Sequence, residues 1–193
     1  MDIDESIVRL AAKLDDWFYG NLATFKSQDV VAQAKAQLEG FEIVKELDRL
    51  KADGLSAMTA LLDRHDPVTG NERAASLLKG FEFGARLADT LHDELRDMEG
   101  ETKVVRLMDA IVKELETIGS GRTALTVLLD HPDAGVRALA GVYLIDLKPE
   151  RVVAILRDIK NKEHANSARF RAFWTLLGWE REGRSRFNYL SAS

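Results

Sequence analysis

The segment "LLDHPDAGVRALA", residues 128–140, concentrates groups that could do chemistry. Asp130, His131, Asp133 and Arg137 offer two carboxylates, an imidazole and a guanidinium within eight positions. Carboxylate and imidazole groups bind divalent metals, and they also carry protons in acid–base catalysis. One interpretation of the segment is therefore a catalytic or metal-binding loop.

A second segment of similar composition lies earlier, in "LLDRHDPVTGNERAA", residues 61–75. It carries Asp63, His65 and Asp66, so stacked copies of the two segments would bring several carboxylates and both imidazoles together. Turn formation explains the same residues more simply, because Asp, His and Pro are common between helices. We expect Pro132 to stop one helix and Asp133 to cap the next.

The remaining motifs do not indicate a reaction. In "HDELRD", residues 92–97, Arg96 stands where a zincin helix needs its second histidine. The run Gly119, Ser120, Gly121 is too short to cradle a phosphate, and no Gly-Lys-Ser or Gly-Lys-Thr follows it. The absence of cysteine excludes thiolate catalysis, cysteine-ligated zinc and disulfides. The sequence therefore predicts no catalytic residue, no metal site and no bound cofactor.

The elements that must position these residues are all predicted to be helices. Strand signals are nearly absent, the chain has three prolines, and apolar residues recur at three and four positions. We expect helices over residues 4–18, 28–52, 55–65, 71–98, 102–118, 121–130, 134–146, 149–161 and 166–182. In the fourth of these, Gly80 or Gly84 could cause a break.

An internal repeat suggests how the helices are arranged. "IVKEL" occurs at residues 43–47 and again at 111–115, and "AMTALLD" at 57–63 matches "ALTVLLD" at 124–130. Recurrence at this distance is typical of helical hairpins that stack, each burying its apolar stripe against the next. We expect an all-α fold of stacked antiparallel hairpins. Arg137 would then pair with the Asp of a neighbouring turn, as a rung between repeats.

Residues 128–159, "LLDHPDAGVRALAGVYLIDLKPERVVAILRDI", resemble a known type of helical repeat. Asp133, Val136, Arg137 and Ala140 fit the second helix of HEAT-like repeats, which this part of the chain resembles. Residues 103–187 are also similar to a bacterial family, domain of unknown function 2019, through "KPERV" at 148–152 and "WEREGR" at 179–184. Both resemblances imply a short HEAT-like α-α superhelix, and neither implies an activity.

This arrangement predicts two regions joined in one continuous structure. Residues 1–100 would form an N-terminal helical region with one diverged repeat, and residues 101–193 a C-terminal HEAT-like domain with a capping helix. In that last helix, Phe170, Phe173 and Trp174 fall on one stripe with Leu177, which we expect to seal the open end of the solenoid. The flanking basic residues would then point outward: Arg169, Arg171 and Arg181.

Two features of charge bear on partners. Residues 1–150 hold 18 Lys and Arg against 28 Asp and Glu, whereas residues 151–193 hold 9 against 4. The acidic part would suit a basic partner and the basic part an acidic one. The candidate exposed binding patch near the carboxyl terminus combines basic and aromatic residues: Arg184, Arg186, Phe187 and Tyr189.

These observations favour a non-enzymatic, protein-binding helical-repeat module. A specific version is an immunity protein that neutralises a basic toxin through charge complementarity. The alternative is a nucleic-acid-binding module that uses the basic tail, which the acidic balance of residues 1–150 opposes. We expect a cytoplasmic protein with no membrane partner, because there is no long apolar run, no signal-peptide pattern and no cysteine.

Overall fold

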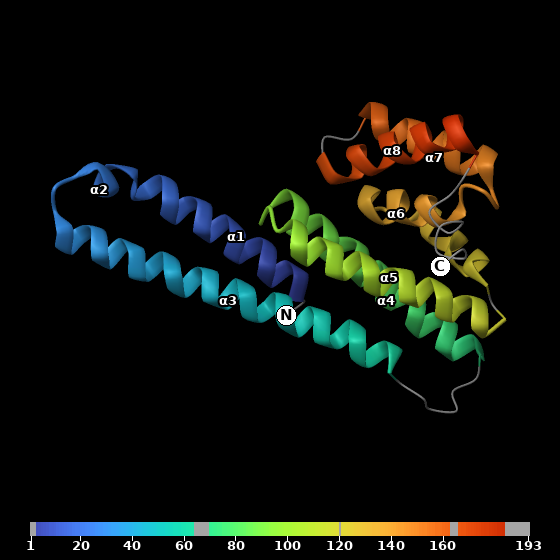
Figure 1. Ribbon diagram of the computed structural model, residues 1–193, viewed down its shortest axis with the longest axis horizontal. Coiled ribbons are helices and arrows are strands. Elements are labelled where there is room, and N and C mark those ends of the chain that lie inside the picture. Colours follow the sequence, from blue (N-terminus) through green and yellow to red (C-terminus); the bar gives the residue numbers. More distant parts are fainter. Residues whose placement is uncertain (1–2, 64–69, 120, 163–165, 184–193) are drawn as a thin grey trace. The chain divides into compact units, whose positions relative to one another are not determined.

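The computed structural model describes residues 3–63, 70–119, 121–162 and 166–183, and it contains helices and turns but no strand within them (Figure 1). The all-α prediction is therefore confirmed for this part of the chain, while the HEAT-like superhelix stays a prediction. The helices are α1 (Ile3–Gly20), α2 (Leu22–Lys26), α3 (Val30–Leu62), α4 (Gly70–Asp93), α5 (Met98–Thr117), the 3₁₀ helix η1 (Arg122–Asp130), α6 (Ala134–Leu144), α7 (Pro149–Lys162) and α8 (Asn166–Glu182).

Helix α3 departs most from the predicted elements. One uninterrupted helix covers the region where two were expected, over 28–52 and 55–65, because Gly54 lies within it without breaking it. Both parts of the first repeat copy therefore lie along α3 or at its end, whereas the second copy is divided between α5 and η1. The break expected between residues 52 and 55 is therefore wrong.

The chain divides into two compact units, residues 1–57 and 58–193, and the division falls within α3. In the first unit, α1 packs beside α3 and the short α2 joins them (Figure 1). Trp17 connects the two long helices, because its indole Nε1 donates to the carbonyl oxygen of Ala36 at 2.9 Å. The ring of Phe25 meets the Trp17 ring edge-on, with 5.6 Å between centroids.

The second unit has the larger core. Helices α4 and α5 pack against each other, and α6 contacts η1, α7, α8 and α4. At the centre, the Phe81 ring meets the ring of Tyr143 edge-on at 5.6 Å. The side chains buried around them include Leu77, Leu87, Leu91, Met108, Ile111, Leu115, Leu125 and Leu129.

Gly80 and Gly84 do not break α4, which runs through both of them to Asp93. They instead allow other side chains to approach the helix closely. A Cβ at Gly84 would lie 2.6 Å from Cε of Met58, and one at Gly80 would overlap Leu61. The helix ends at Asp93, and Arg96 in the turn that follows adopts a positive φ of 55°. None of the described helices is long and apolar enough to cross a membrane.

Candidate interaction surface on helix α8

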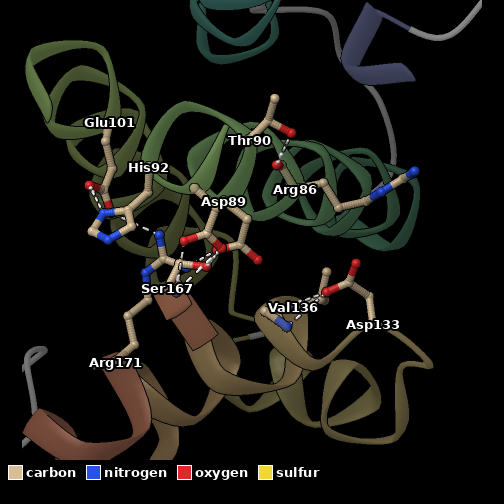
Figure 2. Close-up of polar contacts among 11 residues, drawn as sticks. Arg86, Asp89, Thr90, His92, Glu101, Asp133, Val136, Ser167 and Arg171 are labelled. Atoms are coloured by element: carbon tan, nitrogen blue, oxygen red, sulfur yellow. Dashed lines mark hydrogen bonds and ion pairs between the residues drawn. The ribbon is translucent and has the colours of Figure 1, made fainter. Parts of the chain in front are cut away.

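In the turn at residues 128–140, Asp133 and Pro132 have the structural roles that were predicted for them, whereas the rung predicted for Arg137 stays a prediction. Asp133 caps α6, since its Oδ1 accepts hydrogen bonds from the backbone N–H groups of Gly135 at 2.8 Å and Val136 at 3.1 Å (Figure 2). Pro132 stands between the end of η1 and this cap. His131 Nδ1 accepts from the Asp133 N–H at 3.1 Å, which leaves Nε2 to face Glu82 at 3.2 Å.

Arg137 closes the same turn. Its Nη1 donates to the carbonyl oxygens of His131 at 2.8 Å and Pro132 at 2.7 Å, so both of these bonds stay within its own turn. Arg73 acts similarly at the end of α3, because its guanidinium donates to the Leu61 and Leu62 carbonyl oxygens. Each arginine satisfies carbonyl groups that a helix end or turn leaves without a partner.

No three His, Asp or Glu residues of the described chain are grouped closely enough to hold a metal ion. Asp130 instead pairs with Arg151, whose Nη2 lies 2.6 and 2.7 Å from its carboxylate oxygens. His65 and Asp66, which were to complete the metal site, lie outside the described residues. The arrangement of residues 128–140 therefore favours capping over catalysis.

Asp133→Ala is expected to destabilise the unit of residues 58–193 by about 0.5–2 kcal/mol, because two N–H groups of α6 lose their acceptor. Urea unfolding measures the loss. Asp130→Ala is the control, because it removes a neighbouring carboxylate whose ion pair is largely exposed and should cost less than about 1 kcal/mol. Equal losses in the two variants would contradict the capping role.

Helix α8 presents the opposite face from the one predicted. Phe170 and Trp174 are 55% and 53% exposed and Phe173 is 41% exposed, whereas the side chain of Arg171 is only 10% exposed. The expected aromatic seal and the outward direction of Arg171 are therefore wrong, although Arg169 and Arg181 do face outward. Small residues let the buried face approach its neighbours closely: Ser167, Ala168 and Ala172.

A buried charge network explains this orientation. Figure 2 shows the Arg171 guanidinium between Asp89 of α4 and Glu101 of α5, and it forms ion pairs with both. Nη2 of Arg171 lies 2.8 Å from Glu101 Oε1, and Glu101 Oε2 lies 2.8 Å from His92 Nδ1. Burial lowers the pKa of Arg171 to about 10, which leaves the guanidinium charged at neutral pH.

A second contact fixes the start of α8. The Asp93 carboxylate, at the end of α4, accepts from Ser167 Oγ at 2.6 Å and from the Ser167 N–H at 3.0 Å. A carboxylate at a helix amino terminus also complements the helix dipole. The last turn of α4 therefore anchors α8 at two points, one turn apart, and this sets which side chains face solvent.

The three exposed aromatic residues form one cluster, which we call the α8 aromatic surface: Phe170, Phe173 and Trp174. The Trp174 ring meets Phe170 and Phe173 edge-on, with centroids 5.9 and 5.3 Å apart. Phe170 lies against the His92 ring at 6.1 Å with 31° between planes. Lys160 Nζ lies 5.8 Å from the Phe173 centroid, a cation–π distance.

A groove of about 670 Å³ adjoins this surface, and we call it the α8 groove. Helix α7 contributes Lys160 and Asn161, α4 contributes His92, and α8 contributes Arg169 with two of the aromatic rings. Neither Lys160 nor Arg169 forms an ion pair with another described residue. The groove therefore combines positive charge with aromatic walls.

The first unit has a groove of opposite charge, of about 490 Å³, between α1 and α3. Its walls include Trp17, and its rim carries Glu39, Glu42 and Glu46. Glu46 is bound to Arg49 at 2.6 Å and Glu42 lies 3.8 Å from Lys45. Because Glu42 and Glu46 are already paired, this groove has fewer carboxylates available to bind a cation than the sequence suggests. The α8 site is therefore the stronger candidate.

The predicted carboxyl-terminal patch, Arg184 to Tyr189, lies outside the described residues. The α8 groove was not predicted. Its only signal in the sequence was the combination of Asp89, His92 and Asp93 on one side of a helix, and that pattern names no partner. Comparison of the chain with protein-family models, curated proteins and solved structures finds no match.

Proposed function

We propose that this protein is a helical protein-binding module whose partner docks on the α8 aromatic surface. The observation that carries the proposal is the exposure of Phe170, Phe173 and Trp174 together on one helix face. Aromatic residues are enriched in protein interfaces, where they supply much of the binding free energy. Edge-to-face contacts hold the three rings in place before a partner arrives, so little side-chain entropy is lost on binding.

The anchoring of α8 supports the same proposal. Turning α8 to bury its aromatic rings would be the ordinary way to stabilise such a helix. The fold instead buries Arg171 with Asp89 and Glu101, although ion pairs of this kind add little net stability. An arrangement that keeps aromatic rings in solvent at this cost is what an interaction surface requires.

Finer versions of the proposal concern the partner and the repeat. An immunity protein bound to a basic toxin would use the acidic residues of the first 150 positions, where Glu39 forms no ion pair within the described chain. We likewise propose the HEAT-like superhelix and the relation of residues 103–187 to the bacterial family. A protein partner is common to all of them.

Nucleic-acid binding is the second candidate, because Lys160 and Arg169 lie beside aromatic rings. Single strands bind to grooves in which bases stack on exposed rings and several cations follow the backbone. Lys160 and Arg169, the two groove cations without an ion pair among the described residues, are few for a phosphate backbone. The protein partner is therefore favoured.

The test is a double variant of the surface, Phe170→Ser with Trp174→Ser. A partner captured by the wild-type protein and then purified should bind the variant at least about tenfold more weakly in a titration. Val127→Ser is the matched control, because Val127 is 64% exposed on η1 in the same unit and should leave binding unchanged. Equal binding by both variants would contradict the proposed surface.

A further inference from the structure

The α8 groove has a chemistry of its own beside the aromatic surface. Resting on the proposed function, we propose that it binds an acidic peptide segment of the partner protein. A carboxylate of the segment would lie between Lys160 and Arg169, and a neighbouring apolar side chain would lie against Phe170 and Phe173. The proposed segment of the partner is acidic, which the aromatic surface alone does not indicate.

The charge of the groove selects an anion. Among the described residues, its polar lining consists of an ammonium, a guanidinium, an imidazole and an amide, with no carboxylate. Glu101 contacts His92 of the groove, but its two oxygens are bound by His92 and Arg171. Positive charge beside low-dielectric aromatic walls attracts carboxylates more strongly than the same charge in open solvent.

The number of available cations favours a peptide over a polyanion. Of the other basic side chains on α7, Arg157 is paired with Glu180 at 3.2 Å and Lys162 with Asp158 at 2.5 Å. Lys160 and Arg169 remain without an ion pair among the described residues, and they come from two different helices. Two cations that line one groove from two helices match one or two carboxylates.

His92 would contribute to the same site. Its Nδ1 faces Glu101 Oε2 at 2.8 Å, which fixes the ring and leaves Nε2 as the nitrogen that a ligand can reach. Because Nδ1 donates to the Glu101 carboxylate, Nε2 of the neutral ring is an acceptor that can take a backbone N–H of the segment. A volume of about 670 Å³ accommodates a few residues of an extended segment. The groove thus offers a carboxylate two donors, Lys160 and Arg169, with an apolar wall for the adjacent side chain.

The test uses a fluorescein-labelled peptide of alternating Glu and Phe, followed by fluorescence anisotropy with the full chain. We expect it to bind, and we expect a peptide with Gln in place of Glu to bind at least about tenfold more weakly. Added salt should weaken the binding of the acidic peptide, because its carboxylates interact with exposed cations. Equal binding of the two peptides, or binding of neither, would overturn the inference.

Charge reversal identifies the site. The double variant Lys160→Glu with Arg169→Glu should bind the acidic peptide at least about tenfold more weakly than the wild type. Lys113→Glu with Lys148→Glu is the matched control: it changes the net charge equally at exposed positions outside the groove and should leave affinity within about twofold. Lys160→Gln with Arg169→Gln serves if the reversed protein does not fold, and it should weaken the peptide in the same direction.

Two further outcomes separate the inference from its premise. Tighter binding of labelled oligothymidine, about ten nucleotides long, than of the acidic peptide would overturn it in favour of nucleic acid. The inference would also be overturned by a captured partner that binds the Lys160→Glu, Arg169→Glu variant as tightly as the wild type but does not bind the Phe170→Ser, Trp174→Ser variant. In that case the aromatic surface would still bind a protein, and only the acidic segment would be ruled out.

Discussion

Replacing Arg171 with methionine is expected to destabilise the unit of residues 58–193 by about 3–5 kcal/mol. The guanidinium forms ion pairs with Asp89 and Glu101, and all three side chains are at most one-fifth exposed. Methionine keeps much of the side-chain volume but leaves two carboxylates without their cation in a poorly solvated place. The cost arises from these orphaned charges rather than from the lost attraction alone.

Arg169→Met is the control for this change, because it removes the same group two residues earlier in the same helix. Arg169 is exposed and has no ion pair within the described chain, so we expect a loss below about 0.5 kcal/mol. Urea unfolding is best followed by tryptophan fluorescence in a Trp17→Phe background, since the remaining tryptophans, Trp174 and Trp179, lie in α8.

A second change tests the mechanism of the loss. Adding Asp89→Asn and Glu101→Gln to Arg171→Met removes the orphaned charges and should restore part of the stability. Amides can still accept and donate hydrogen bonds at these positions. If Arg171→Met were no more harmful than Arg169→Met, the buried network would not hold α8 in its observed orientation, and the exposed aromatic surface would need another explanation.

The helices from α4 to α8 were predictable from the sequence because their signals are local. The cap by Asp133 and the boundary at Pro132 depend on atoms within three residues, and both are found where expected. The two copies of "IVKEL" show where such signals differ. After the second copy, Gly119 and Gly121 adopt positive φ of 76° and 61°, which ends α5, whereas Gly54 after the first copy remains helical.

The orientation of α8 could not be predicted in this way. Apolar spacing places Phe170, Phe173 and Trp174 on one stripe, and such a stripe usually faces the core. The stripe faces solvent because Arg171 reaches Asp89 and Glu101, which are 82 and 70 positions away in the sequence. An ion pair between residues so far apart leaves no periodic pattern in the sequence. The candidate site could therefore be identified only from the structure.

Arg122→Met is the second change with a large expected effect, again about 3–5 kcal/mol in the unit of residues 58–193. Arg122 lies at the start of η1 with a side chain only 9% exposed. Its Nη1 and Nη2 donate to the two carboxylate oxygens of Asp146 at 2.9 and 2.6 Å, and Nη1 also donates to the Tyr143 carbonyl oxygen at 2.9 Å. Its loss would leave both acceptors underbonded at the end of α6.

Arg151→Met provides the contrast, because Arg151 binds Asp130 at a similar distance on the surface. The two side chains of that pair are 43% and 75% exposed, and its removal should cost less than about 1 kcal/mol. Arg122→Lys should fall between the two, since lysine keeps the charge but cannot form the paired bonds to Asp146. Equal losses for Arg122→Met and Arg151→Met would mean that burial does not decide the strength of these pairs, and the expectation for Arg171 would fail by the same reasoning.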